Sequence, residues 1–191
     1  MTTDMLKGKL VRLAAVDAKE LADVIVKWNR DSEYQRLAMI EPANQYSVKK
    51  LAEWGEKDQE KDPPEFYYFA IRDLENDRLL GSCGLGGDIF PNGEAFVGIG
   101  IGNRQDWNKG YGTDAMKVLL RYAFEELNVR RVALSALENN ARGIRSYEKA
   151  GFSYEGKSRG TIQRAGRRWD DVFMGILRDE WLAKEHEISS H

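Results

Sequence analysis

Hydrophobic residues recur at helical spacing in the first third of the chain. Leu21, Val24 and Trp28 fall on one face of a predicted helix, and Asp17 in front of them is a good N-cap because its side chain can accept a free backbone N–H. Ser47 is likewise a good N-cap in front of a second run of hydrophobic residues at helical spacing. The predicted elements of this part are a strand over residues 9–13, a helix after Asp17, an undecided stretch over residues 31–40 and a helix after Ser47.

From residue 66 onward the hydrophobic spacing shortens to that of strands. Turn signals at residues 75–77 and 91–93 separate three such strands, which predicts an antiparallel meander. Helical and strand spacing then alternate without a linker or repeat, so we expect one mixed domain. The predicted elements are strands over 66–72, 78–89, 94–102, 131–137, 152–157 and 169–177, helices over 113–127 and 141–150, and a frayed or disordered tail from residue 178.

Composition narrows the classes of function. The chain of 191 residues carries 29 basic and 31 acidic residues, for a net charge of −2, and this near-balance argues against a general nucleic-acid binder. Cys83 is the only cysteine, and the two histidines, His186 and His191, stand near the C-terminus. We therefore expect no disulfide, no His-based triad and no metal site. No apolar run is long enough to span a bilayer, so we expect no membrane partner and a cytoplasmic location.

The stretch over residues 94–112 carries the strongest chemical signal. Gly98, Gly100 and Gly102 interrupt its strand at alternate positions, which indicates a bulge or a ligand that runs along the backbone. The turn over residues 109–113 contains two more glycines and opens directly into a helix. Backbone N–H groups at such a helix start converge on one point, with the helix dipole behind them. The sequence therefore predicts an anion site suited to phosphate.

A dinucleotide site is one alternative for this turn. Gly110-x-Gly112-x-x-Ala115 matches the fingerprint G-x-G-x-x-G/A, and Glu138 closes the next strand, where a ribose-binding acid would stand. In that fold, however, the first glycine follows its strand directly, whereas residues 103–109 intervene here. Most strands are also joined by hairpin signals instead of crossover helices, so we keep dinucleotide binding only as a remote alternative.

Two longer motifs together point to a known family. The segment Trp107-Asn-Lys-Gly-Tyr-Gly-Thr-Asp-Ala115 resembles the acetyl-CoA pyrophosphate loop of the GCN5-related N-acetyltransferase (GNAT) superfamily, in the branch of the ribosomal-protein alanine acetyltransferases. The segment Asn140-Ala-Arg-Gly-Ile-Arg-Ser-Tyr-Glu-Lys-Ala-Gly-Phe152 is similar to the family's Asn-led turn, helix and Gly-Phe ending. The resemblance covers roughly residues 6–181, which would form the core of a single domain over residues 1–191, with residues 182–191 as a frayed tail.

The resemblance implies a fold, a reaction and a donor. The fold would be α/β (α+β), with a mixed, mostly antiparallel sheet of about seven strands that is splayed in the middle and flanked by helices. The reaction would be direct transfer of an acetyl group from acetyl-CoA to a primary amine. That amine could belong to a protein N-terminus or to a small molecule such as a polyamine, an aminoglycoside or an amino acid. A non-catalytic acyl-CoA sensor is the alternative, and the tryptophans and final strands would suit a homodimer.

The same resemblance assigns residues to acetyl-CoA. The loop amides, with the charge of Lys109, would hold the diphosphate. The glycine-interrupted strand would pair with the pantetheine arm, and one of its N–H groups would stabilise the developing oxyanion, a contribution of roughly 3 kcal/mol. Asn140 is a natural N-cap that could also bind pantetheine. The residues assigned to acetyl-CoA are Ile99, Gly100, Ile101, Trp107, Lys109, Gly110, Tyr111, Gly112, Thr113, Asn140, Arg142, Tyr147 and Lys149.

Candidate catalytic residues follow from the chemistry of the transfer. Tyr147 matches the family tyrosine that protonates the departing CoA thiolate, although a tyrosine on this helix face could also simply pack. The acceptor amine must lose a proton before attack, so a base or a chain of waters is expected. Glu94 and Asp88 are the candidate bases. The family often has an acidic residue where this chain has Phe96, and the alternative for both carboxylates is that they are surface residues.

Overall fold

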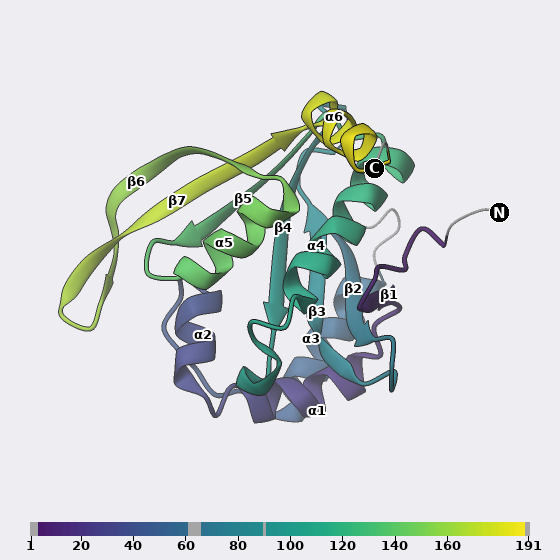
Figure 1. Ribbon diagram of the computed structural model, residues 1–191. Coiled ribbons are helices and arrows are strands. Elements are labelled where there is room, and N and C mark those ends of the chain that lie inside the picture. Colours follow the sequence, from purple (N-terminus) through teal and green to yellow (C-terminus); the bar gives the residue numbers. More distant parts are fainter. Residues whose placement is uncertain (1–3, 61–65, 90, 190–191) are drawn as a thin grey trace.

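Seven strands form one sheet in the order β1-β2-β3-β4-β5-β7-β6 (Figure 1). The computed structural model describes residues 4–60, 66–89 and 91–189. Neighbouring strands are antiparallel except for β4 and β5, which are parallel. The predicted mixed, mostly antiparallel sheet is therefore confirmed. The strands are β1 (Val11–Ala14), β2 (Phe66–Asp73), β3 (Leu79–Gly86), β4 (Glu94–Ile101), β5 (Arg131–Leu137), β6 (Ser153–Arg164) and β7 (Arg167–Leu177).

The sheet splits between its two parallel strands. β4 pairs with β5 only over Glu94–Phe96, whereas it pairs with β3 from Phe96 to Ile101. The edge of residues 97–101 that faces β5 therefore has no strand partner in the described part of the chain. This is the splay that the family resemblance implied, and it leaves backbone polar groups of β4 available to a ligand.

Helices cover both faces of the sheet. Ile71 and Leu80 belong to the main core, which lies under α4, whereas their neighbours Ala70 and Leu79 pack against α1 on the other face, as the two-residue period of a strand requires. α4 and α5 lie side by side over the middle of the sheet (Figure 1). The helical elements are α1 (Ala18–Trp28), α2 (Ser32–Ala38), α3 (Val48–Gln59), η1 (Arg104–Asp106), α4 (Tyr111–Arg121), η2 (Tyr122–Glu126), α5 (Ala141–Ala150) and α6 (Arg178–Ser189).

α4 is the best-buried helix and is fixed at both ends. Met116 and Leu119 are fully buried, and each contributes roughly 1.5–3 kcal/mol to folding. Asp114 accepts the backbone N–H groups of residues 9–11 at 2.7–3.1 Å, and Arg121 donates to the carbonyl oxygens of residues 5 and 7. The N-terminal segment thus clamps α4 against the sheet and holds its first turn in position.

Several element boundaries differ from the sequence-based prediction. The undecided stretch over 31–40 forms α2, with the Asp31 side chain accepting the N–H of Glu33. The helix predicted over 113–127 begins at Tyr111 and ends in the π-helical turn η2. The tail forms α6 as far as Ser189.

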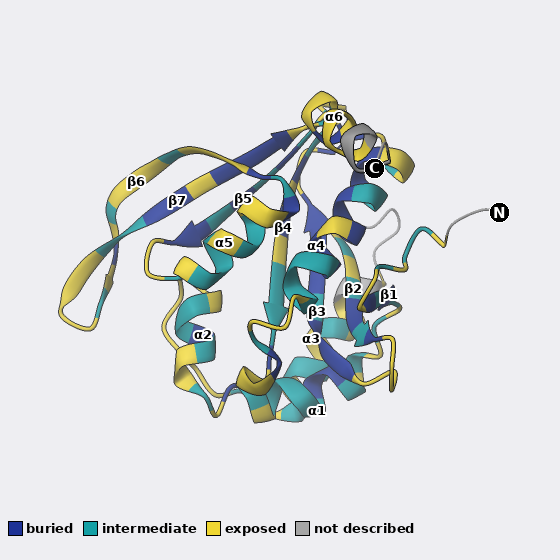
Figure 2. Ribbon diagram, in the orientation of Figure 1, coloured by how far each residue is buried: buried dark blue, intermediate teal, exposed yellow. Residues whose placement is uncertain are grey.

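The largest difference concerns the last two strands. The polar segment predicted to join them instead continues β6 to Arg164, and β7 begins at Arg167. Ala165 and Gly166 form a two-residue turn in which both φ angles are positive, at 53° and 76°, as a type I′ hairpin turn requires. The outer part of this hairpin extends beyond the helices, and β6 is largely exposed there (Figure 2).

Candidate active site

A cavity of about 580 Å³ lies where β4 and β5 separate. Its walls come from the end of α2, the unpaired half of β4, the first turn of α4, the end of β5, α5 and β7. The structure brings all residues assigned to acetyl-CoA to this cavity except Lys109. Those that line it are Ile99, Gly100, Ile101, Trp107, Gly110, Tyr111, Gly112, Thr113, Asn140, Arg142, Tyr147 and Lys149.

The N-terminus of α4 is built differently from those of α1, α2, α3 and α5. In α1, α3 and α5 the N-cap side chain accepts a backbone N–H of the first turn. In α4 the N-cap is Gly110, which has no such side chain, and the first bond inside the helix is donated by the N–H of Asp114. The N–H groups of residues 111–113 precede that bond and have no partner inside the helix. Residues 111–113 line the cavity with the helix dipole behind them, an arrangement that suits an anion.

Gly110 is required by the geometry of the loop. Its φ is +88°, a left-handed conformation that costs other residues roughly 1–2 kcal/mol. A Cβ there would also lie 3.2 Å from Cδ1 of Leu10, in the clamping N-terminal segment. The glycine therefore allows the chain to turn sharply from the loop into α4.

Trp107 and Arg142 form one wall of the cavity. The indole N–H of Trp107 donates to the carbonyl of Ile101 at 2.7 Å, which ties the loop to the end of β4. The guanidinium carbon of Arg142 lies 3.4 Å from the Trp107 ring centroid, a cation–π contact. Burial lowers the pKa of Arg142, since its charge is partly removed from water. The pair places a positive charge beside the anion site.

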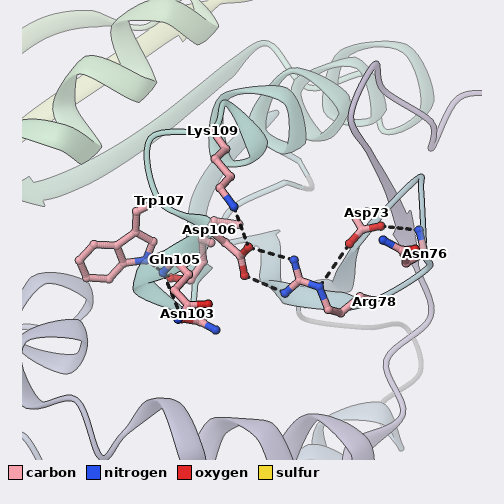
Figure 3. A network of polar contacts seen from close by, with 9 residues as sticks. Asp73, Asn76, Arg78, Asn103, Gln105, Asp106, Trp107 and Lys109 are labelled. Carbon is pink, nitrogen blue, oxygen red and sulfur yellow. Dashed lines mark hydrogen bonds and ion pairs between the residues drawn. The ribbon is translucent and has the colours of Figure 1, made fainter.

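Lys109 does not line the cavity, because its ammonium turns toward a buried carboxylate (Figure 3). Nζ of Lys109 lies 3.8 Å from Asp106, whose carboxylate accepts two hydrogen bonds from Arg78 at 2.8 and 2.9 Å. The hydrogen bonds from Arg78 lower the pKa of Asp106, although burial opposes the shift. Arg78 also contacts Asp73 at 3.5 Å. This network fixes the loop between β4 and α4, and sequence reasoning missed it because Arg78 and Asp106 are far apart in the chain.

Tyr147 and Asn140 present α5 to the cavity. Tyr147 is partly buried and packs edge-on against Phe152, with ring centroids 6.2 Å apart. Burial raises the pKa of Tyr147 to about 12, so its phenol is protonated at neutral pH and can donate a proton. Asn140 caps α5 by accepting the N–H of Gly143, and its Nδ2 donates to the carbonyl of Leu37 at 3.2 Å. The cap is confirmed, and the second bond holds α5 against α2.

The two candidate bases lie outside the cavity. Glu94 stands at the start of β4, where the sheet is still paired, and its carboxylate forms ion pairs with Arg130 and Arg131. Asp88 follows β3 and accepts a hydrogen bond from Asn92. Both residues are at the closed end of β4, whereas the split begins at residue 97. The structure therefore does not bring either carboxylate to the proposed acetyl-CoA site.

Other cavity residues were not singled out from the sequence. Met39, Ile40 and Glu41 follow α2, and Asp171 lies on β7, so no local pattern connects them with the glycine loop. Tyr34 also lines the cavity, and a Cβ at Gly100 would come within 2.8 Å of its hydroxyl oxygen. Gly100 thus allows α2 to approach β4 closely. The alternating glycines in the sequence did not indicate this contact.

The site fits acetyl-CoA on the chemistry of its own residues. The free N–H groups of α4 suit a diphosphate, the unpaired edge of β4 suits an amide-containing arm, and Arg142, Arg145 and Lys149 supply positive charge. Across residues 4–60, 66–89 and 91–189, no three His, Cys, Asp or Glu side chains cluster so that they could hold a metal ion. Among the helices described there, none is long and apolar enough to cross a membrane.

Comparisons with known proteins agree with this reading. Residues 11–153 match the family model described as "Acetyltransferase (GNAT) domain". "Probable N-acetyltransferase YjcK" of Bacillus subtilis is 33% identical over 92% of this chain and 98% of its own. "Putative ribosomal N-acetyltransferase YdaF" of the same organism is 37% identical, over 56% of this chain and 58% of its own.

A solved structure matches the fold closely. The spermidine N-acetyltransferase of Vibrio cholerae, crystallised with CoA and spermine, superimposes with a TM-score of 0.79 at 23% identity, over 90% of this chain and 98% of that one. None of these matches supports a non-catalytic sensor or a dinucleotide-binding protein. The chain belongs to the GNAT family of N-acetyltransferases, enzymes that take the acetyl group from acetyl-CoA.

Proposed function

We propose that the acceptor is the N-terminal amine of a protein or peptide. The observation that carries this proposal is the mixture of side chains in the part of the cavity away from α4. Leu37, Met39, Ile40 and Phe96 are apolar and line it, and Met39, Ile40 and Phe96 are about half exposed. An acceptor with one ammonium on a partly apolar chain would suit such a surface.

The charge of the cavity disfavours a polyamine. Three carboxylates line it, and one of them, Asp106, is already paired with Arg78. Glu41 and Asp171 remain, against Arg142, Arg145 and Lys149. A polyamine carries several positive charges, which would meet more cations than free carboxylates here. A peptide N-terminus brings a single charge.

Each group in the site has a separate role in the proposed acetyl transfer. When bound, acetyl-CoA supplies an acetyl group activated as a thioester. The N–H groups of residues 111–113 would hold its diphosphate, and the unpaired edge of residues 97–101 would hold its arm. One N–H of Ile99, Gly100 or Ile101 would polarise the thioester carbonyl. Tyr147, protonated at neutral pH, would deliver a proton to the sulfur as it leaves.

A CoA-release assay over a panel of amines tests the proposed acceptor. The panel contains short peptides that begin with Ala or Ser, the same peptides with a blocked N-terminus and an internal lysine, spermidine, spermine, kanamycin and free alanine. We expect the free peptides to show a kcat/KM at least about tenfold above the others. They alone combine a single positive charge at the N-terminus with a chain that can contact the apolar side chains of the cavity. Preference for spermidine would replace this proposal by a polyamine acceptor, and equal rates with blocked peptides would point to lysine side chains.

Three further statements stay predictions from the sequence. They are the single domain over residues 1–191, the homodimer and the cytoplasmic location. Light scattering on the purified protein would test the homodimer directly.

A further inference from the structure

A buried carboxylate in the cavity has an oxygen with no partner. Asp171 lies in β7, opposite Leu137 of β5, and is only 7% exposed. It lines the cavity. Its Oδ1 is fully buried, and the described residues offer this atom no hydrogen bond. A buried polar atom without a partner costs roughly 1–3 kcal/mol, more when it is charged, so such an atom at a cavity indicates a ligand that supplies the partner.

The charged groups around Asp171 are engaged elsewhere. On β7 itself, Asp170 pairs with Lys157 of β6 and accepts the N–H of Gly160. From the end of β5, Glu138 accepts the N–H of Asp170.

Several other titratable and charged groups line the cavity, including Arg145 and Lys149 of α5, which form no ion pair with Asp171 within the described residues. On α5, Arg142 lies over the ring of Trp107, and Tyr147 is protonated at neutral pH. From β6, Arg164 donates to carbonyl oxygens of the segment after α2, where Glu41 is exposed at the rim of the cavity. Among the described residues no ion pair involves Asp171, so its charge is available to an incoming cation.

Burial and one neighbour set the proton affinity of this carboxyl. Burial raises the pKa of Asp171, and a hydrogen bond from Ser135 of β5 opposes the shift by stabilising the ionised form. A carboxylate with a raised pKa is a better proton acceptor than one at the surface.

We propose that Asp171 binds the acceptor ammonium through its carboxylate and removes its proton. The inference rests on the acetyl transfer described above and not on the choice between peptide and polyamine. One proton moves from the acceptor nitrogen to the Asp171 carboxylate, which leaves a neutral amine with a free electron pair. That pair forms the new N–C bond to the acetyl group while the C–S bond of the thioester breaks. The sulfur takes up a proton, for which Tyr147 is the proposed donor. The acylated nitrogen then loses its second proton, which through solvent replaces the one that Tyr147 gave, and the proton on Asp171 also passes to solvent.

The assignment also explains why the other carboxylates do not serve. Glu94 and Asp88 lie at the closed end of the sheet and are already paired. Asp106 is held by Arg78, which stabilises its ionised form and lowers its proton affinity. Of the carboxylates that line the cavity, Asp171 is the one that is both buried and unpaired within the described residues.

Two neighbouring substitutions provide the test. We expect Asp171→Asn to lower kcat/KM for an Ala-initiated tetrapeptide, and for spermidine in parallel, by about 10²–10⁴-fold, the range for loss of a general base. Asp170→Asn is the matched control, because its carboxylate faces Lys157 outside the cavity, and it should stay within about threefold of the unmodified protein. Both variants should keep their affinity for acetyl-CoA, measured by calorimetry.

The pH dependence distinguishes a base from a structural residue. In the unmodified enzyme kcat/KM should fall at acid pH as Asp171 takes up a proton, and Ser135→Ala should move that fall to higher pH because the ionised form loses a hydrogen bond. The pH profile of Asp171→Asn should lack this fall in kcat/KM. Binding of n-butylamine to the CoA-saturated protein gives a readout without turnover, and Asp171→Asn should weaken it at least tenfold.

Three results would overturn the proposal. In the first, Asp171→Asn keeps more than a third of the original kcat/KM. In the second, Ser135→Ala leaves the fall of kcat/KM at acid pH where it was. In the third, Asp171→Asn loses acetyl-CoA binding together with activity, which would make Asp171 a structural residue. Failure of the unmodified protein to release CoA with any amine would instead contradict the acetyl transfer. The butylamine measurement would still decide whether Asp171 binds amines.

Discussion

In the proposed mechanism, the hydroxyl of Tyr147 donates a proton to the thiolate as it leaves. Tyr147→Phe removes that proton donor and keeps the ring that packs against Phe152. We therefore expect kcat to fall by about 10²–10³-fold, with the affinity for acetyl-CoA unchanged. Steady-state kinetics together with calorimetry of acetyl-CoA binding would measure the two effects separately.

Tyr154→Phe is the control for this substitution. Tyr154 is 60% exposed on β6 and does not line the cavity, so loss of its hydroxyl should leave kcat within about twofold. A Tyr147→Phe enzyme with full kcat would show that this tyrosine only packs, and water would then be the proton donor.

At the scale of elements, the loop that enters α4 determines how well the diphosphate is held. Gly110→Ala would force a Cβ into a left-handed conformation and toward Leu10. We expect a loss of roughly 1–2 kcal/mol of stability, and an acetyl-CoA Kd at least about tenfold higher, because the N–H groups of residues 111–113 would no longer converge. Thermal melting and calorimetry would measure the two quantities.

Gly166→Ala separates the backbone cost from the binding effect. Gly166 also has a positive φ, +76°, but lies in the turn between β6 and β7, and its Cβ would meet nothing within 4 Å. This variant should lose stability to a similar extent while the acetyl-CoA Kd stays the same. Equal binding losses in both variants would mean that general destabilisation weakens binding, and the loop would have no special role.

The hairpin of β6 and β7 supports the acceptor side of the cavity. Arg164 donates to the carbonyl oxygens of Met39, Ile40 and Glu41 at 2.9–3.1 Å, and these residues line the cavity. Arg164→Gln should release this segment and raise the KM for the acceptor about tenfold, since several hydrogen bonds of about 1 kcal/mol each are lost. The acetyl-CoA Kd should not change, and Arg159→Gln, an exposed position on β6 outside the cavity, should alter neither value.

Sequence reasoning was most accurate where a local rule decides the structure. The caps at Asp17, Ser47 and Asn140 were predicted because one side chain completes one helix end, and the structure confirms all three. The glycine loop was found for the same reason, since its residues are consecutive. The prediction from the sequence failed on β6. Its outer residues are polar apart from Ile162 and give no hydrophobic period, and pairing with β7 makes them a strand.

The parts of the site that escaped prediction depend on contacts between distant segments. Asp171 reaches the cavity because β7 pairs with β5, and Leu137 is its register partner 34 positions earlier. Arg78 meets Asp106 across 28 positions, through the pairing of β3 with β4. Neither pairing can be read from the spacing of charged residues along the chain, so the candidate bases chosen from the sequence, Glu94 and Asp88, were neighbours of the motif in sequence and not in space.

For the whole molecule, a ligand bound in the cavity between β4 and β5 contacts elements that come apart when the chain unfolds. β4, α4 and α5 all line the cavity, and a ligand that holds them binds the folded chain only. Acetyl-CoA at about one hundred times its Kd should therefore add about 2.7 kcal/mol to the free energy of unfolding, which for a chain of this length raises Tm by roughly 5–10 °C. NAD at the same concentration is the control. It also carries a diphosphate but lacks the pantetheine arm that the unpaired edge of β4 would hold, so it should shift Tm by less than a quarter as much. A larger shift with NAD than with acetyl-CoA would contradict the assignment of β4 to the arm and would restore the dinucleotide interpretation of the glycine loop.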